Sequence, residues 1–367
     1  MLRFQNGINA DSTKYGKGIK YISVSDILNN QYITYDCIKG LIDIDEKTFN
    51  KFIVEYGDIL FQRSSETFED IGRANVYLDK EHSATFGGFV IRGKKISDYN
   101  PLFFRYLLCT HNARKQTVRM GAGAQHYNIG QEGLEKICLY FPCLQEQQKI
   151  SDFLSAIDNK IAAQNKIISD LKVLKKELCN KVFSKGSAVR LGDFIEEVTT
   201  RNKSNSCENV LSVSNKMGFI KQSEQFEDRT VASENKSNYK VVTEGCFAYN
   251  PARINVGSIA LLSTQIGIIS PMYVCFKAKS ALDSEYLNFY YQSGFFYKEL
   301  QKKLEGSVRQ CLTYENMSEI LIPYVGIEEQ KAIAATLNKF ATLIANEEKY
   351  LKSLQKQKSY FLNAMFI

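Results

Sequence analysis

The sequence lacks the signals that direct a chain into or across a membrane. It contains no run of about 18 apolar residues, so we expect no membrane-spanning helix, and residues 1–6 show no apolar segment of a signal peptide. The nine cysteines are scattered, odd in number and without a Cys-x-x-Cys pair, which disfavours a disulfide framework or a zinc site. We therefore expect reduced thiols and a cytoplasmic location.

Signals of catalysis are also missing. There is no Gly-x-x-x-x-Gly-Lys-Ser/Thr phosphate loop, and His82, His111 and His126 are isolated from one another. Residues 250–253 partly match the Asn-Pro-Pro-aromatic motif of amino-methyltransferases, but the second proline, the aromatic residue and a glycine-rich cofactor loop are absent. Residues 329–331 have the Glu-x-Lys form of a nuclease half-motif without a partner carboxylate, so a solvated helix face is the better interpretation. We expect no catalytic residue, no cofactor and no metal.

What the sequence does contain is an internal repeat. Residues 145–183 align with residues 328–366 without a gap, and both segments place apolar residues at alternating spacings of 3 and 4. Such spacing is typical of a coiled-coil seam, and 39 residues form about 60 Å of helix. A helix of that length with one apolar stripe needs a partner, and the other copy is the nearest candidate. The alternative is two surface helices on separate cores.

A mixed α/β globule precedes each predicted helix, so we expect an α/β (α+β) fold with an internal repeat. The predicted boundaries are residues 1–142, 143–186, 187–323 and 324–367. Residues 210–214 match 21–25, and residues 244–247 match 56–59. The first globule is predicted to close with a strand over 136–140, whereas the opening strand of the second globule has no evident counterpart in the first. Because the helices are much more alike than the globules, we expect a common scaffold that carries two different readers.

This layout resembles the specificity (S) subunits of type I DNA restriction-modification systems, over essentially the whole chain. The resemblance rests on several segments: Pro142 with Glu146-Gln147, Pro323 with Glu329-Gln330, residues 57–61 with 63–67, residues 247–258, Leu191-Gly192-Asp193, and the ending Met365-Phe366-Ile367. It implies a non-catalytic subunit with two target recognition domains, each of which reads one half of a split, asymmetric site on double-stranded DNA. It also implies an antiparallel coiled coil that spaces these domains and docks two methyltransferase (modification) subunits, which restriction (motor-nuclease) subunits join.

The net charge of +7 permits a polyanionic partner, and two loops in each globule suit DNA. Both combine Arg with amide or hydroxyl side chains beside Gly or Pro, the residue types that read base edges and bind phosphates. The predicted contacts are Arg63, Ser64, Ser65, Arg73, Gln125 and His126 in the first globule, and Asn250, Arg253, Asn255, Arg309 and Gln310 in the second. For Arg63 and Arg253, which follow strands directly, a purely structural role is an equal alternative.

Three other functions stay open on the sequence alone. The chain is also compatible with a specificity subunit of another bipartite-site restriction-modification class, which the sequence of a neighbouring subunit would distinguish. A stand-alone DNA-modifying enzyme would transfer methyl groups or cleave DNA by itself. A purely structural coiled-coil linker would show no salt-dependent binding to DNA.

Overall fold

The apolar residues at spacings of 3 and 4 fold into two long helices, α6 (Leu144–Phe183) and α11 (Ile327–Met365). The structure, a computed structural model, describes residues 1–123, 126–215, 217–225, 236–263, 266–304 and 310–366. The chain divides into two compact units: unit 1 comprises Met1–Gln164 and Tyr350–Ile367, and unit 2 comprises Asn165–Lys349. Both long helices therefore contribute residues to both units. No helix in the described part of the chain is long and apolar enough to cross a membrane.

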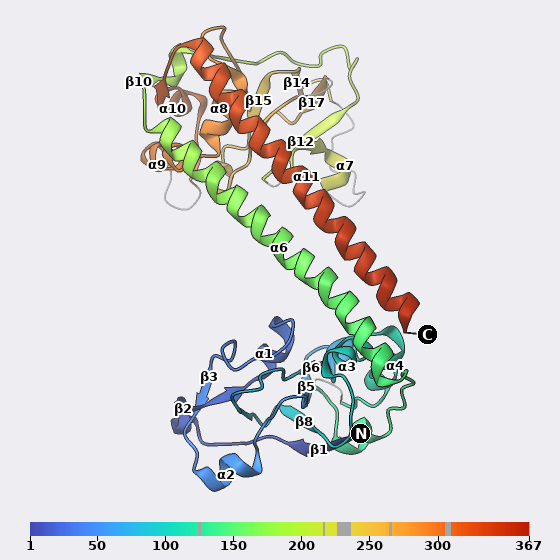
Figure 1. Ribbon diagram of the computed structural model, residues 1–367. Coiled ribbons are helices and arrows are strands. Elements are labelled where there is room, and N and C mark those ends of the chain that lie inside the picture. The colour runs from blue at the N-terminus through green and yellow to red at the C-terminus, as the bar shows by residue number, and fades with distance from the viewer. Residues whose placement is uncertain (124–125, 216, 226–235, 264–265, 305–309, 367) are drawn as a thin grey trace. The chain divides into compact units, whose positions relative to one another are not determined.

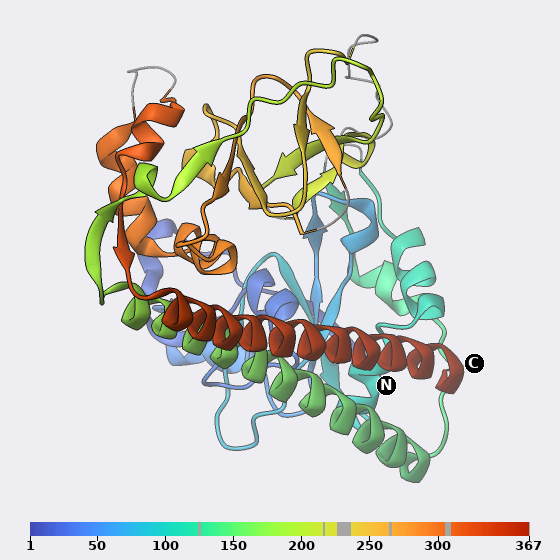
Figure 2. The same cartoon turned by 90° about the horizontal axis from the view of Figure 1, so that it is seen from above.

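The two helices pack against each other in antiparallel directions within each unit (Figures 1 and 2). In unit 1 the rings of Phe153 and Phe361 lie 4.9 Å apart, and Asp158 forms an ion pair with Lys358 at 2.5 Å. In unit 2, Lys172 forms an ion pair with Glu348 at 2.7 Å, and residues 178–183 share a core with residues 333–337. The predicted coiled-coil pairing is thereby confirmed. Buried leucines in this seam, among them Leu154 and Leu337, each contribute about 1.5–3 kcal/mol.

Unit 1 is built on an antiparallel sheet of order β1-β8-β4-β6, with a three-stranded sheet β3-β2-β7 and a short pair β5-β9. Its strands are β1 (Leu2–Asn6), β2 (Tyr15–Ile22), β3 (Gly40–Ile42), β4 (Ile59–Gln62), β5 (Ser64–Ser65), β6 (Ala74–Val76), β7 (Thr85–Phe86), β8 (Val90–Lys95) and β9 (Tyr127–Asn128). Its shorter helices are η1 (Ser12–Lys14), α1 (Val24–Asn29), α2 (Glu46–Lys51), η2 (Phe68–Asp70), α3 (Pro101–Leu107), α4 (His111–Arg119) and α5 (Gln131–Glu135).

Unit 2 repeats this plan with the sheets β11-β18-β15-β16 and β13-β12-β17-β14 and adds a pair β10-β19. Its strands are β10 (Ser187–Arg190), β11 (Ile195–Glu197), β12 (Val210–Ser214), β13 (Gly218–Lys221), β14 (Lys240–Val242), β15 (Cys246–Tyr249), β16 (Ile259–Leu261), β17 (Gly267–Ile269), β18 (Val274–Ala278) and β19 (Leu321–Tyr324). Its shorter helices are η3 (Leu191–Asp193), α7 (Gln222–Gln225), η4 (Ile254–Val256), α8 (Ser284–Tyr291), α9 (Gly294–Lys303) and α10 (Tyr314–Ser318).

The sheet registers confirm the repeat between the two globules. Ile22 pairs with Phe86 in parallel, as Leu211 pairs with Ile269. A glycine with positive φ precedes each central strand, Gly57 before β4 and Gly245 before β15. Glycine is favoured at both turns because residues with a Cβ rarely adopt this conformation.

A buried glutamine fastens the start of each long helix to a neighbouring helix. In unit 1, Gln147 Oε1 accepts a hydrogen bond from the Asn100 N–H (3.0 Å) at the cap of α3, and its Nε2 donates to the Pro142 carbonyl (2.9 Å). In unit 2, Gln330 makes the same two bonds, to the Asp283 N–H at the cap of α8 and to the Val325 carbonyl, both at 2.8 Å. This contact explains why a glutamine stands at the same point of both helices.

One predicted strand is wrong. Residues 136–140 do not form a strand, although their equivalents in unit 2 form β19. The physical reason is the partner: β19 is paired by β10, and no strand in the described part of unit 1 occupies the corresponding place. A single extended segment without a neighbouring strand has no ladder of hydrogen bonds.

Candidate nucleic-acid interface

The central strands of both units, β4 and β15, end in polar loops that occupy equivalent places. The Gln62 N–H donates to the Arg73 carbonyl (2.8 Å), and the Asn250 N–H donates to the Ser258 carbonyl (3.1 Å). The side chains of Gln62 and Asn250 are only 5% and 8% exposed. The repeat therefore places a buried amide side chain at the base of each loop.

These buried amides hold the loop backbone two residues further on. Gln62 Nε2 donates to the Ser64 carbonyl at 2.8 Å, and Asn250 Oδ1 accepts from the Ala252 N–H at 3.0 Å. Local bonds of this kind stabilise a turn in place of a regular strand. The predicted contact residue Asn250 is thus placed as a residue that shapes the loop.

A second loop is fixed beside the first one in each unit by an equivalent backbone bond. The Ile129 N–H donates to the Arg63 carbonyl (3.0 Å) in unit 1, and the Leu312 N–H donates to the Pro251 carbonyl (3.1 Å) in unit 2. In unit 1 the two loops also pair as strands, β5 with β9. In unit 1 the structure therefore brings together the two loops that the sequence singled out, whereas most of the second loop of unit 2 lies outside the described residues.

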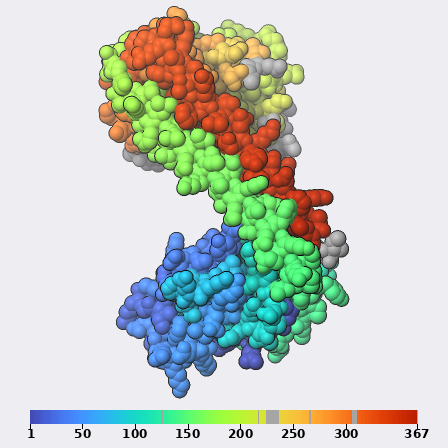
Figure 3. All heavy atoms as spheres, in the orientation of Figure 1, coloured from blue at the N-terminus to red at the C-terminus, as the bar shows by residue number. Residues whose placement is uncertain are grey.

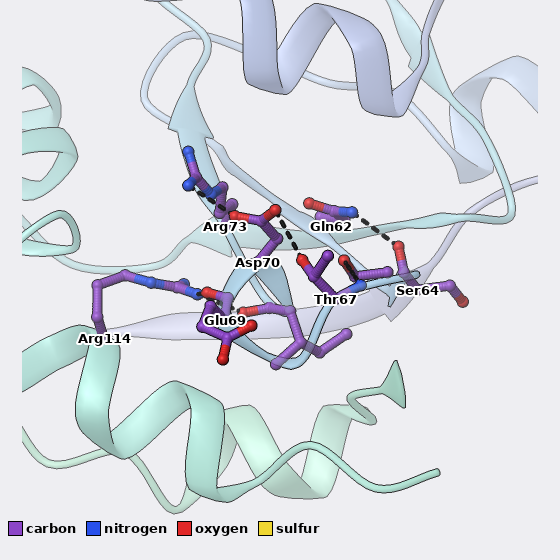
Figure 4. Close-up of polar contacts among 9 residues, drawn as sticks. Gln62, Ser64, Thr67, Glu69, Asp70, Arg73 and Arg114 are labelled. Atoms are coloured by element: carbon purple, nitrogen blue, oxygen red, sulfur yellow. Dashed lines mark hydrogen bonds and ion pairs between the residues drawn. The ribbon is translucent and has the colours of Figure 1, made fainter. Parts of the chain in front are cut away.

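An ion pair orders the outer part of the loop in unit 1 (Figure 4). Arg73 contacts Asp70 at 2.6 Å, and the Thr67 hydroxyl donates to the second oxygen of the same carboxylate at 2.7 Å. The Thr67 hydrogen bond, together with Arg73, holds the pKa of Asp70 below its usual value. Because 55% of the Arg73 side chain stays exposed, its guanidinium can still bind a phosphate.

Arg114 supports this loop from α4. Its guanidinium donates to the carbonyls of Glu69 (2.8 Å) and Ile71 (2.7 Å), and Figure 4 shows Arg114 beside Glu69. Burial lowers the pKa of Arg114, and the nearby positive charge of Arg73 lowers it further. Two guanidinium groups thus lie close together beside one loop, an arrangement that attracts anions.

The other predicted residues of unit 1 are held in place by the loop itself. Arg63 is half-buried and donates from Nη1 to the Gly88 carbonyl at 3.3 Å. The Ser64 hydroxyl donates to the side chain of Asn128, and Ser65 Oγ accepts from the Thr67 N–H at 3.2 Å. His126 is exposed next to β9. Gln125 lies outside the described residues.

In the loop of unit 2, the side chain of Arg253 has fewer contacts than those of Arg63 and Arg73 in unit 1. Arg253 is exposed at the start of η4, and its carbonyl accepts from the N–H groups of Val256 and Ser258, both at 3.2 Å. Within the described part of the chain, the Arg253 guanidinium makes no hydrogen bond or ion pair. Asn255 and Gln310 are exposed on the same pair of loops, whereas Arg309 lies outside the described residues.

Sequence reasoning missed two residues that build these loops, Gln62 as a loop-shaping amide and Arg114. The position of Gln62, opposite Asn250 in the repeat, was a usable signal. The sequence held no such signal for Arg114, because Glu69 and Ile71, whose carbonyls it binds, lie more than 40 residues earlier in the chain. The arrangement holds polar side chains at a surface; among the described residues, no three His, Cys, Asp or Glu side chains are grouped as metal ligands.

Comparisons with known proteins agree on one family. The family model described as "Type I restriction modification DNA specificity domain" matches residues 5–173 and again residues 185–356. The type I restriction enzyme MjaVIII specificity subunit of Methanocaldococcus jannaschii is 25% identical to this chain, over 97% of this chain and 90% of the relative.

Solved structures share the fold. The S subunit of a type I restriction-modification system from M. genitalium superposes over 100% of this chain and 94% of that chain, with a TM-score of 0.60 and 13% identity. A chain from a structure that addresses complex assembly and conformational transition of the type I R-M system matches over 98% of this chain and 96% of that chain, with a TM-score of 0.52 and 14% identity.

Proposed function

The chain belongs to the family of type I restriction modification DNA specificity proteins, and we propose that it reads a bipartite DNA site through its two loop pairs. The observation that carries this proposal is the repeated backbone frame with different side chains. The same two backbone bonds fix both loop pairs, whereas Arg63 and Ser64 stand where unit 2 has Pro251 and Ala252. Equal frames with unequal polar residues suit two halves of an asymmetric site. The chain itself supplies recognition, and partner subunits supply catalysis.

Base recognition in this proposal comes from the exposed side chains of the loops. Arg253, Asn255 and Gln310 are exposed in unit 2 and can donate to or accept from base edges. In unit 1, Arg73 and Arg63 supply positive charge for phosphates, and Ser64 and His126 lie beside them. Gln125 and Arg309 remain predicted contacts.

A substitution in unit 2 tests the assignment. Arg253→Ala in the assembled complex should slow site-specific adenine methylation about 5- to 150-fold, because one lost base contact costs about 1–3 kcal/mol. Methylation rates on DNA with each half-site varied separately would measure the effect, which should fall on one half-site. Lys331→Ala, an exposed cation on α11, is the matched control and should leave the rate unchanged. An unaltered rate and preference for Arg253→Ala would contradict the loop assignment.

Two modification subunits are the partners proposed for the outer faces of the long helices. In unit 2 the surface of α6 exposes Ile167 (46%), Val173 (57%) and Leu174 (55%). Figure 3 shows that parts of both long helices are uncovered on the side that it displays. Large apolar side chains that stay exposed on a helix often mark a protein interface. Restriction subunits then join through the modification subunits.

This docking proposal has its own test. Val173→Asp with Leu174→Asp should abolish co-purification of the modification subunit, since a buried unpaired carboxylate in an interface costs several kcal/mol. The paired change Lys176→Ala with Lys181→Ala on the same helix is the control for loss of exposed polar residues. Retained co-purification with the two aspartates would remove this face from the proposed interface.

A further inference from the structure

A tight turn before β8 presents an exposed aromatic side chain in unit 1. The Val90 N–H donates to the Gly87 carbonyl at 2.8 Å and closes the turn, and 67% of Phe89 at its tip is exposed. A Cβ at Gly87 would overlap the ring of Tyr21 in β2, so the turn is packed closely against this strand. The close packing fixes the place of the Phe89 backbone.

The turn is also fastened to the loop that carries the predicted contacts Arg63 and Ser64. The Arg63 N–H donates to the Phe89 carbonyl at 2.8 Å, and Arg63 Nη1 donates to the Gly88 carbonyl at 3.3 Å. An aromatic side chain that stays exposed beside a polar loop is available to whatever the loop binds. Phe89 therefore belongs to the same candidate interface as the loop.

A pocket of about 310 Å³ opens between this turn, the loop and the start of α1. Its walls combine apolar side chains with hydroxyl groups, and they include Phe89, Val24, Val90, Tyr21, Ser25 and Ser64. The pocket is therefore shaped to take a small group that is partly apolar.

The serine hydroxyls around this pocket already use their hydrogens within the protein. The Ser23 hydroxyl donates to the Asp26 carboxylate at 2.7 Å, so in the bond of 2.8 Å between Ser23 and Ser25 the donor is Ser25. The Ser64 hydroxyl donates to the side chain of Asn128. These serines therefore offer oxygen lone pairs to a ligand, next to the apolar surface of Phe89.

Among the bases of DNA, this chemistry favours an A·T pair. In the major groove the apolar group of a base edge is the 5-methyl group of thymine, and phenylalanine is one of the side chains that contact it. The paired adenine offers an amino donor to oxygen lone pairs, whereas guanine presents two acceptors. The pocket thus suits the thymine methyl group and disfavours guanine.

The repeat places the same turn in unit 2 with another apolar residue at its tip. The Tyr273 N–H donates to the Ser270 carbonyl at 3.1 Å, and 58% of Met272 is exposed. The turn follows the strand that pairs in parallel with the strand before α1 or β13, in equal register in both units. A turn that recurs while its tip changes from Phe89 to Met272 is expected where the tip residue selects a base.

We infer that Phe89 is a specificity-determining residue whose ring contacts the 5-methyl group of one thymine in the half-site that unit 1 reads. This inference rests on the proposed function and adds to it a base and the side chain that selects it. Uracil differs from thymine only in lacking this methyl group. Exchange of thymine for uracil therefore isolates the contact.

Single thymine-to-uracil exchanges along both half-sites test this inference in the complex of the full chain with its modification subunit. With the parental chain, one exchange should lower kcat/KM of methylation about four- to tenfold, the effect of one methyl group lost from an apolar contact. Phe89→Ala should methylate the thymine and uracil substrates of that position at equal rates. The ratio of the two rates is the readout, because a purely structural defect lowers both together.

Met272→Ala removes the equivalent exposed side chain of unit 2 and is the matched control. It should keep the parental thymine-to-uracil ratio at the position that Phe89 reads. Sequence-specific methylation with equal rates on all thymine and uracil substrates, or a ratio that survives Phe89→Ala, overturns this inference and leaves the proposed function standing. Methylation that depends on neither half-site overturns both.

Discussion

Gln330 is a single buried side chain that fixes the start of α11 to neighbouring backbone groups. It is fully buried and makes three hydrogen bonds: it accepts from the Asp283 N–H (2.8 Å) and donates to the carbonyls of Val325 (2.8 Å) and Ala281 (3.2 Å). A side chain of similar size without polar atoms would leave these backbone groups buried and unpaired. Each such group costs about 1–3 kcal/mol.

We predict that Gln330→Leu loosens the first turn of α11 by about 1–3 kcal/mol. This corresponds to amide exchange about 5–150 times faster for residues 330–334 and for the first turn of α8. Lys331→Gln, which removes only the exposed ion pair with Glu328, is the control and should change exchange little. Exchange that stays at the parental rate in Gln330→Leu would show that the glutamine does not fasten the helix.

For single residues, the sequence predicted which polar side chains belong to the loops better than it predicted what each side chain does there. Asn250 was predicted as a contact because of its polar side chain, and its burial and bond to Ala252 became visible only in the fold. The contacts of the two glutamines with Asn100 and Asp283 were not predictable, because these partners lie 47 residues away along the chain.

At the scale of elements, the equivalent lysines of the two long helices, Lys175 and Lys358, contact different side chains. In unit 1, Lys358 contacts the Asp158 carboxylate, which also accepts from the Tyr106 hydroxyl at 2.8 Å. In unit 2, Lys175 lies over the ring of Phe289 at 5.1 Å, and Ala341 stands where unit 1 has the acid. Burial raises the pKa of Tyr106, and the neighbouring Asp158 carboxylate raises it further.

We predict that Asp158→Ala destabilises unit 1 by about 3 kcal/mol. Loss of one partner of a largely buried pair leaves the other charge uncompensated, and Lys358, at 23% exposed, keeps only partial contact with solvent. The double change Asp158→Ala with Lys358→Met should recover most of that loss. Urea unfolding followed by exchange of amides in residues 150–164 measures both. A double variant as unstable as the single one would contradict this account.

Helices were the elements most accessible to sequence reasoning. The 3-and-4 spacing of apolar residues over 39 positions predicted the two long helices α6 and α11, because a local period determines a helix, but it did not determine their exact ends. The strand expected over residues 136–140 failed for the opposite reason. A strand depends on its neighbour, and the neighbour of β19 has no counterpart in the described part of unit 1.

For the whole molecule, duplication explains both what is constant and what varies. The sheet order, the buried amides and the glutamine contacts recur in both units, so they belong to the scaffold. The exposed loop residues differ between the units, as expected of two readers of an asymmetric site. Sequence pattern and resemblance indicated this plan, whereas the proposed base contacts depend on single loop side chains, which no sequence period encodes.

The most direct measurement of the central claim is a map of methylated adenines in the host DNA, with the gene present and with it deleted. We predict a split, asymmetric methylated motif that disappears with the gene, returns on complementation and changes in one half only with Arg253→Ala. An identical set of methylated sites in both strains, even when the modification subunit is co-expressed with this chain, would contradict the assignment of this chain as the reader of the DNA sequence.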